Sequence, residues 1–482
     1  MNLVQRVVST SIFLTFLGGS FGAAEELKRP NIVFMYADDW RWDCIGAYQR
    51  DQGEKGRFPW LETPRIDKLA ETSVRFDQSF VVNSLCSPGR TCVLTGQYSH
   101  LNGIIGNSKP LPVDTLIFPK LLRQAGYTTA YCGKWHLDNQ RERPGFDFVA
   151  SFVGQGKYND CPILLNGKEM PTHGWIDDIT TGYAVQFLDG QKSNDKPFFL
   201  WLGFKSPHGP RGGESLPERA RGLYAGKESR GVPNLDTPAI FERDKTPPAN
   251  PEKRLAKQFE GHRAYMRHIT MIDECVGRVL DALDKNGEAE NTVVIVSGDN
   301  GYYLGEHMLS DKRSAYDESM RVPLLIHMPG NDAKHGVNND AMVLNIDYGP
   351  TILDLAGAKP LPEGQGRSLR PLLTNGESKD WRTAFFYEYF KEPNYTSPTV
   401  LAVRTNSSKL ITYPGHDEWT EVFDLKNDPY ELKNLIDEKS VLEKMRAEFD
   451  AQSAAVKFRM PKLPKEDGAD KKNVHSPAVD GG

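Results

Sequence analysis

Long apolar runs are nearly absent from this 482-residue sequence. One apolar stretch, residues 7–17, lies near the N-terminus. It is shorter than the roughly 20 residues that a membrane-spanning helix needs, and no other segment approaches that length. An excess of positive charge is also lacking, since the formal net charge is −5. This balance argues against a protein that binds nucleic acid by neutralising phosphates, but it does not exclude a local basic pocket.

Cysteine is scarce as well, because the chain contains only six. That number is too small for disulfides to be the main source of stability in a protein of this length. The remaining composition, 39% hydrophobic and 26% charged, is ordinary for a globular protein with a sizeable core. The length predicts two or three domains, or one large domain with a smaller one.

The first 24 residues have the pattern of an export signal. Arg6 supplies a positive charge, the apolar stretch follows, and small residues occupy much of positions 18–24. We expect cleavage near Gly22 or Ala24 and export of the mature chain to the periplasm or outside the cell. An uncleaved or lipid-anchored form is the alternative, although no cysteine stands at the expected cleavage site.

Apolar runs alternate with helical patterns over residues 25–364, which predicts an α/β domain with a largely buried sheet. The predicted strands cover residues 31–37, 128–132, 198–204 and 292–297. Apolar residues recur at helical spacing over 255–283, so a long amphipathic helix is expected there, ending at Asn286-Gly287. A shorter helix is expected over 116–123, before Gly126.

The pattern changes from about residue 365. Short strand-like runs at 385–390, 399–404 and 409–413 are separated by proline, asparagine and glycine, which predicts an antiparallel sheet. Residues 432–449 are expected to form a helix. We therefore predict a smaller C-terminal domain over 365–460, and a disordered tail over 461–482, where large apolar side chains are almost absent.

Each of the four predicted strands of the first domain runs into a cluster of polar side chains. Ligands bind beyond the carboxyl ends of strands in open parallel sheets, so these clusters are expected to converge. The clusters are Asp38 and Asp39 after the first strand, Lys134 and His136 after the second, Lys205 and His208 after the third, and Asp299, Asn300, His307 and Lys312 after the fourth.

Five motifs resemble, in the same order, those of type I sulfatases of the alkaline phosphatase superfamily. They are Asp38-Asp39, Cys86-Ser87-Pro88-Gly89-Arg90, Gly133-Lys134-Trp135-His136, Lys205-Ser206-Pro207-His208, and Asp299-Asn300-Gly301 followed by Gly305-Glu306-His307. The resemblance covers essentially the whole mature chain. It implies a large, mostly parallel sheet flanked by helices, with a smaller C-terminal α+β domain.

The resemblance also implies that Cys86 is converted to formylglycine (3-oxoalanine), an aldehyde whose hydrate attacks sulfate esters. A formylglycine-generating or sulfatase-maturing enzyme would be the partner for this step. Five cysteines would then remain, an odd number, so at least one thiol would stay unpaired. In this family the sulfated hydrate collapses to the aldehyde by losing sulfate, a step that a serine ester could not perform.

A divalent metal is implied by the same motifs. Carboxylate and amide oxygens are hard ligands, and with an oxygen of modified Cys86 they suit Ca²⁺, or Mg²⁺ as the alternative. Zinc is disfavoured because the set lacks a histidine and cysteine tetrad. The implied metal ligands are Asp38, Asp39, Cys86, Asp299 and Asn300.

The other side chains implied in catalysis and substrate binding are all basic. Histidine suits proton transfer near neutral pH. Arg90 and Lys134 would orient and polarise the hydrate, His136 would assist proton removal, His208 would protonate the leaving oxygen and contact the substrate, and Lys205 and Lys312 would hold the sulfate oxygens. His307 is expected to play a structural role.

An exported hydrolase with a metal and a sulfate pocket suits sulfated carbohydrate. The similarity to bacterial glycosaminoglycan sulfatases favours 6-O-sulfated N-acetylglucosamine, with an iduronate-2-sulfatase as the near alternative. His416, Trp419 and Tyr389 are candidates for the pocket rim. Two rival classes stay open: a phosphodiesterase or phosphonate monoester hydrolase of the same superfamily, and a non-catalytic carbohydrate-binding relative.

Overall fold

The computed structural model describes residues 29–463 except 193, 245–250, 331–332 and 394. The predicted signal peptide and most of the predicted tail lie outside these residues. The strands are β1 (Asn31–Ala37), β2 (Val74–Phe76), β3 (Ser79–Phe80), β4 (Thr128–Lys134), β5 (Phe148–Phe152), β6 (Ile163–Leu165), β7 (Lys168–Met170), β8 (Phe198–Gly203), β9 (Thr292–Gly298), β10 (Leu324–His327), β11 (Val337–Asn339), β12 (Val343–Leu344), β13 (Ala384–Tyr389), β14 (Val400–Thr405), β15 (Ser408–Thr412) and β16 (Glu421–Asp424).

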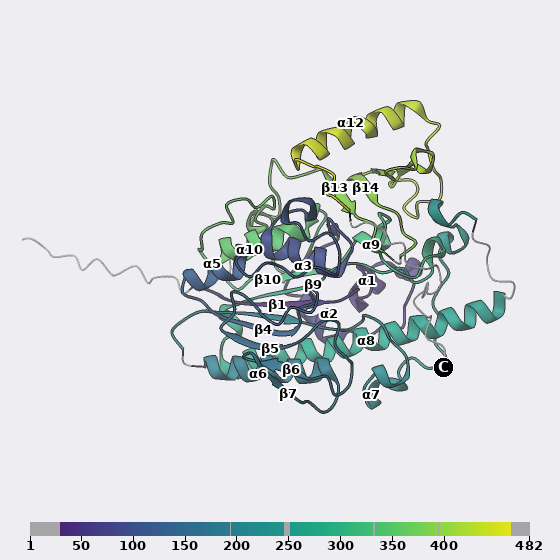
Figure 1. The fold of residues 1–482 in the computed structure, drawn as a ribbon. Helices are drawn as coiled ribbons and strands as arrows, with labels where there is room; N and C mark the ends of the chain where they lie inside the picture. Colours follow the sequence, from purple (N-terminus) through teal and green to yellow (C-terminus); the bar gives the residue numbers. More distant parts are fainter. Residues whose placement is uncertain (1–28, 193, 245–250, 331–332, 394, 464–482) are drawn as a thin grey trace, which may run out of the picture.

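The α-helices range from single turns to one long helix that spans the molecule (Figure 1). They are α1 (Gly46–Asp51), α2 (Pro64–Ala70), α3 (Cys86–Thr95), α4 (Ser99–Asn102), α5 (Phe118–Gln124), α6 (Ile176–Gln191), α7 (Glu218–Arg221), α8 (Pro251–Asn286), α9 (Asp317–Met320), α10 (Tyr348–Leu355), α11 (Arg370–Thr374) and α12 (Lys439–Ala455). The long helix predicted over 255–283 is confirmed as α8, which ends at the predicted residue, Asn286.

A ten-stranded sheet forms the centre, with the order β11-β2-β10-β9-β1-β8-β4-β5-β6-β7. Its middle strands β9, β1, β8, β4 and β5 are all parallel to one another, whereas β10, β6 and β7 add antiparallel pairs on the two sides. The four strands predicted from apolar runs are neighbours in this parallel part. Their carboxyl ends therefore meet at one edge, and the predicted fold class is confirmed.

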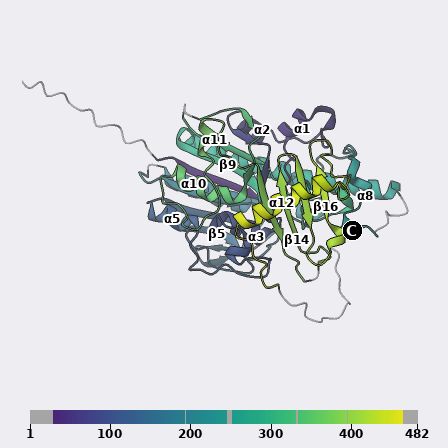
Figure 2. The ribbon, with the colours of Figure 1, turned by 90° about the horizontal axis from the view of Figure 1, so that it is seen from above.

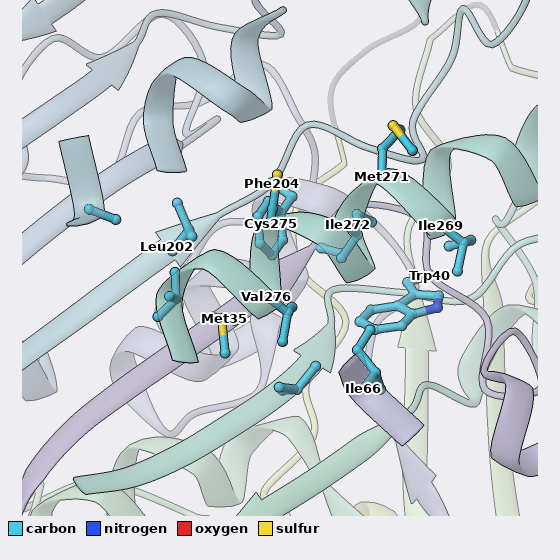
Figure 3. Packing of buried hydrophobic residues seen from close by; sticks show 14 of the residues in the cluster. Met35, Trp40, Ile66, Leu202, Phe204, Ile269, Met271, Ile272, Cys275 and Val276 are labelled. Carbon is cyan, nitrogen blue, oxygen red and sulfur yellow. The ribbon is translucent and has the colours of Figure 1, made fainter. Parts of the chain in front are cut away.

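Alternate residues of the central strands face two separate hydrophobic cores. Val33 and Met35 of β1 pack in one core with α6 and α8, and Phe34 and Tyr36 pack in the other with α5 and α10. Figure 1 shows these helix pairs on opposite faces of the sheet. In Figure 3 the α8 residue Val276 lies close to Met35 in the first core. Burial on both faces explains why these strands are continuous apolar runs.

A four-stranded antiparallel sheet, β13-β14-β15-β16, forms the C-terminal part, with α12 packed across it (Figure 2). The three predicted strands are confirmed, and β16 is an addition. The predicted helix start at residue 432 is wrong, because α12 begins at Lys439. Side chains hold the preceding segment in irregular turns instead: Asp428 accepts the backbone N–H of Leu432, and Asn434 accepts that of Ile436.

The C-terminal sheet is joined to the large sheet's domain by buried polar contacts. The Tyr98 hydroxyl donates to the Phe386 carbonyl at 2.9 Å, and Asp317 forms ion pairs with Arg404 and Lys409 at 3.0 and 2.7 Å. The boundary predicted near residue 365 stays a prediction. Among the described residues, no helix combines the length and apolar character needed to cross a membrane.

Candidate active site

Two neighbouring parallel strands deliver the acidic part of the site. Asp38 and Asp39 directly follow β1, and Asp299 directly follows β9, which pairs with β1 in register. The Asp39 backbone N–H donates to Asp299 Oδ1 at 3.0 Å, which fixes the two strand ends to each other. Three carboxylate oxygens, one from each aspartate, lie within 4.8 Å of one another, and all three residues are buried. The predicted acidic cluster therefore exists as a compact group.

Cys86 is the first residue of α3 and is fully buried beside this group. Its Sγ lies 3.4 Å from Asp38 Oδ1 and 3.1 Å from Lys312 Nζ. Burial raises the pKa of the Cys86 thiol to about 12. A neutral thiol is a poor nucleophile, so the unmodified side chain is badly suited to attack an ester at neutral pH.

Arg90, one turn further along α3, ties the helix to two strand ends. Its Nε donates to Asp299 Oδ2 at 2.9 Å, and its Nη1 donates to the Lys134 carbonyl at 2.7 Å. Its Nη2 also lies 3.8 Å from Asp38 Oδ2. Because the Arg90 side chain is only 2% exposed, these contacts are shielded from water and from salt.

The acidic group fits a hard divalent cation. Asn300 donates its amide N–H to Asp39 Oδ1 at 2.8 Å, but its own Oδ1 is buried without a hydrogen-bond partner among the described residues. Buried carbonyl oxygens are rarely left unpaired in proteins. Three carboxylates and this free amide oxygen are the ligand types that Ca²⁺ or Mg²⁺ prefers.

Three buried lysines surround the cysteine and the acids. Lys134 at the end of β4 pairs with Asp38 and donates to Gln155 Oε1 at 2.6 Å, and Lys312 pairs with Asp39. Although burial lowers the pKa of Lys312, the negative charge of Asp39 raises it overall. Lys205 Nζ donates to the Gln155 carbonyl at 3.1 Å, and burial lowers its pKa to about 8.

The two predicted histidines both belong to this basic environment. His208 Nδ1 lies 2.8 Å from the Gly209 carbonyl, and a ring nitrogen of His208 lies within 4.8 Å of ligand atoms of Asp38 and Cys86. His136 is buried, and its Nδ1 has no hydrogen-bond partner among the described residues. Burial, and then the positive charge of Lys134, lower the pKa of both rings well below the ordinary histidine value.

The sequence of this chain matches two known protein families. The sulfatase family model matches residues 30–358, which include every side chain described above. The chain belongs to the sulfatase family. A second model, N-sulphoglucosamine sulphohydrolase, C-terminal, matches residues 305–457. The protein is therefore a sulfuric ester hydrolase.

The similarity to known relatives covers most of the length of this sulfatase. It is 34% identical to an N-acetylglucosamine-6-O-sulfatase of Bacteroides thetaiotaomicron, over 85% of this chain and 83% of the relative. A structure solved with its substrate D-glucosamine-2-N,6-O-disulfate is 30% identical, with a TM-score of 0.79, and covers 89% of this chain and 98% of the other. The phosphonate monoester hydrolase of Agrobacterium radiobacter, at 20% identity and a TM-score of 0.70 over 89% of this chain and 95% of the other, shares the fold.

Sequence reasoning missed several residues that support the sulfatase site. Gln155 binds both Lys134 and Lys205, and Asp177 of α6 accepts the backbone N–H groups of Lys205 and Ser206 at 2.7 and 3.0 Å. The signal for Gln155 was its place between two glycines after an apolar run, which is typical of a tight turn. Asp177 carried no local signal, because it acts from a helix far away in the chain.

Arg211 is another residue that the motifs did not indicate. Its Nη2 lies 3.5 Å from Asp39 Oδ2, and its guanidinium carbon lies 4.0 Å from the centroid of the Tyr302 ring. The Arg211 side chain is 16% exposed, whereas that of Asp39 is 2% exposed. Arg211 lies three residues after the end of the motif Lys205-Ser206-Pro207-His208, so the motif did not indicate it.

His307 and the three candidates for the pocket rim lie in different surroundings. His307 is buried, 3.1 Å from Asn234 Nδ2 and stacked on Tyr316 at 3.9 Å between ring centroids, which agrees with a structural role. Tyr389 is fully buried in the hydrophobic core of the C-terminal sheet, so it does not form a rim. His416 and Trp419 stack on each other at 3.8 Å.

Proposed function

We propose that this sulfatase is exported and removes the 6-O-sulfate of N-acetylglucosamine in glycosaminoglycan-type carbohydrate. The observation that carries the proposal is the 34% identity, over most of both chains, to an N-acetylglucosamine-6-O-sulfatase. The fold match to a structure that contains a 6-O-sulfated glucosamine supports the same sugar class. The signal-like first 24 residues support export.

Cys86 is the proposed nucleophile position, as formylglycine made by a maturing enzyme. When formed and hydrated, this group supplies a geminal pair of hydroxyls for attack on the ester. Asp38, Asp39, Asp299, Asn300 and the modified residue 86 are the proposed ligands of Ca²⁺, with Mg²⁺ as the alternative. A cation held by these residues would supply Lewis acidity and a positive charge at the position proposed for the sulfate.

Arg90 and Lys134 are the proposed positioning groups of the reacting side chain. Arg90 fixes the start of α3 to Asp299, and Lys134 pairs with Asp38, whose other oxygen is 3.4 Å from Cys86 Sγ. Both side chains are buried, so their contacts act at short range with little screening by water, although burial lowers the pKa of Lys134 well below the ordinary lysine value. Held in this way, residue 86 faces the sulfate in one orientation.

His136 and His208 are the proposed proton carriers. With the pKa of each ring lowered, both are neutral in the free enzyme at neutral pH. A neutral His136 accepts a proton, as removal of a hydroxyl proton requires. His208 gains its proton as the anionic sulfate binds beside it, because that charge opposes the effect of the lysines and raises the pKa.

Lys205 and Lys312 are the proposed sulfate ligands, and Lys205 gives the site a measurable pH limit. Because burial lowers the pKa of Lys205 to about 8, it holds its charge below pH 8 and loses it above. The KM for a sulfated sugar is therefore expected to rise on the order of tenfold between pH 7 and pH 9, as a single titrating group requires.

Initial rates across this range would measure the effect. Lys205→Met should raise KM at pH 7 and remove the rise toward pH 9, whereas the exposed Lys168→Met should keep the profile of the unmodified sequence. A flat KM in the parent enzyme up to pH 9 would show that Lys205 does not bind the substrate.

The decisive experiment measures inorganic sulfate by ion chromatography. A panel of sulfated sugars would include N-acetylglucosamine-6-sulfate, 2-O-sulfated iduronate and a matched phosphate ester. We expect fastest release from the 6-sulfate, none from Cys86→Ala, and loss of release after chelation that added Ca²⁺ restores. Peptide mass analysis should find formylglycine at position 86.

Each outcome changes a different part of the proposal. Faster release from sulfated iduronate would move the sugar to the iduronate-2-sulfatase alternative. Faster phosphate release would favour the phosphodiesterase or phosphonate hydrolase alternative. An unmodified Cys86 thiol in active enzyme would refute formylglycine, and a mature secreted chain that retains residues 1–24 would refute cleavage of the signal.

A further inference from the structure

One carboxylate of the C-terminal part, Glu392, contacts two segments that each connect to the surroundings of Cys86. Glu392 Oε1 accepts the backbone N–H of Asn107 at 2.8 Å. Its other oxygen, Oε2, accepts two N–H groups of Arg313, from Nε at 3.1 Å and from Nη2 at 3.0 Å. The Glu392 side chain is 12% exposed and that of Arg313 4%, so the contacts are largely dry.

The two sets of Glu392 contacts, with Asn107 and with Arg313, are called the Glu392 bridge. Its contact with Asn107 is connected to the start of α3. Asn107 Oδ1 accepts the backbone N–H of Ser87 at 3.0 Å, and Ser87 directly follows Cys86. The Ser87 hydroxyl in turn donates to the His136 carbonyl at 2.6 Å. Holding Asn107 in place therefore holds the backbone next to the nucleophile and, through it, the strand end that carries His136.

The contact of the Glu392 bridge with Arg313 is connected to the proposed sulfate-binding lysine. Arg313 directly follows Lys312, whose Nζ is 3.1 Å from Cys86 Sγ. Arg313 also pairs with Asp311, and its guanidinium carbon lies 3.4 Å from the centroid of the Tyr395 ring. Its contacts with Glu392, Asp311 and Tyr395 restrict the guanidinium. The restricted Arg313 side chain in turn restrains the neighbouring backbone of Lys312.

We propose that Glu392 is a positioning residue of the sulfatase reaction, which sets the distance between residue 86 and Lys312. A carboxylate suits this place because it accepts a neutral backbone N–H on one oxygen and a two-pronged, charge-assisted bond from arginine on the other. Misplacement of reacting groups by about 1 Å costs on the order of 100-fold in rate. The inference rests on the proposed roles of Cys86 and Lys312, and it holds for any sugar.

The chain offers a matched control in Glu388, four residues earlier at the end of β13. Glu388 also links the C-terminal sheet to an element of the large sheet's domain. It accepts the backbone N–H of His100 in α4 at 3.0 Å and contacts His100 Nδ1 at 2.7 Å. It is fully buried, so its loss should cost more stability than loss of Glu392. Its side chain binds His100 of α4, whereas that of Glu392 binds Asn107 and Arg313.

The test compares kcat, KM and melting temperature of Glu392→Ala, Glu392→Gln and Glu388→Gln, on whichever sulfate ester the parent enzyme hydrolyses fastest. Rates are expressed per molecule with formylglycine at position 86. Glu392→Ala should lower kcat 10- to 100-fold and raise KM by a smaller factor, because Lys312 is also a proposed sulfate ligand. Glu392→Gln should lose less, because its amide oxygen still accepts the Asn107 N–H. Glu388→Gln should lower the melting temperature but keep kcat within threefold.

A double-mutant cycle with Asn107→Ala tests whether the bridge acts as a unit. If it does, Glu392→Ala combined with Asn107→Ala should be hardly slower than the slower single variant. The proposal is overturned if kcat of Glu392→Ala stays within threefold of the parent, if Glu388→Gln loses as much kcat, or if the two effects multiply. A different preferred sugar in the parent enzyme would change the proposed substrate but not this comparison.

Discussion

Cys86→Ser is expected to lower steady-state sulfate release by a factor on the order of 10³ or more, the scale seen when a nucleophile is removed. A serine has one hydroxyl on its Cβ, whereas a hydrated aldehyde has two. A sulfated serine therefore has no neighbouring hydroxyl that could expel the sulfate, and the enzyme would stop after one turnover at best. Intact-protein mass spectrometry after incubation with substrate, alongside ion chromatography of sulfate, would measure both effects.

Cys92→Ser is the matched control for this experiment. Cys92 lies on the same helix, is equally buried, and has its Sγ 3.5 Å from the Ser99 hydroxyl. The Ser99 hydroxyl is a polar partner for a serine at this position, and Cys92 has no proposed catalytic role, so turnover should stay within a few-fold of the parent. Equal losses in both variants would mean that the effect is one of packing in α3, and parent-like turnover in Cys86→Ser would refute the nucleophile assignment.

Arg90→Met is expected to destabilise the fold by about 3–5 kcal/mol, the usual cost of breaking a buried ion pair from one side. The substitution keeps most of the side-chain volume but leaves Asp299 without its 2.9 Å partner and the Lys134 carbonyl without a donor. Urea-induced unfolding, followed by circular dichroism, would give the free energy of unfolding. Sulfate release should fall as well, because α3 is no longer fixed to the strand ends.

The exposed pair of Arg123 and Asp147 provides the comparison for Arg90. These groups are 2.8 Å apart, but their side chains are 49% and 36% exposed. Arg123→Met should cost less than about 1 kcal/mol, because exposed ion pairs contribute little. If the two substitutions had equal effects on the free energy of unfolding, the Arg90 contacts would not be a buried anchor. Added Ca²⁺ that restores the stability of Arg90→Met would instead show that a cation can replace the guanidinium.

The central strands and the acidic cluster were predictable from the sequence because each depends on local signals. β1, β8 and β9 are buried on both faces and read as unbroken apolar runs, and the polar residue after each run marks the functional edge of the sheet. The order of the motifs then indicated the resemblance to type I sulfatases. The last two strands of the sheet order, β6 and β7, have three residues each, and their pattern is too short to be recognised.

The supporting residues could not be predicted, because their partners are distant in the chain. Glu392 and Arg313 are 79 residues apart, and Asp39 and Arg211 are 172 apart. Such pairs have no periodicity, and either member alone looks like an ordinary surface charge. The start of α12 was missed for a related reason, since the side chains of Asp428 and Asn434 compete with helical hydrogen bonds in the segment before it.

The complete burial of α3 sets an order of events in the biosynthesis of this enzyme. Every residue from Cys86 to Thr95 is buried, and the helix lies between the large sheet's strand ends and the C-terminal part. The proposed maturing enzyme would need access to the Cys86 side chain, which is fully buried in the folded molecule. The proposed oxidation therefore has to precede folding, while the segment is still an extended polypeptide. A chain that folded before the proposed oxidation would have its thiol out of reach, so the active fraction would depend on the relative rates of oxidation and folding.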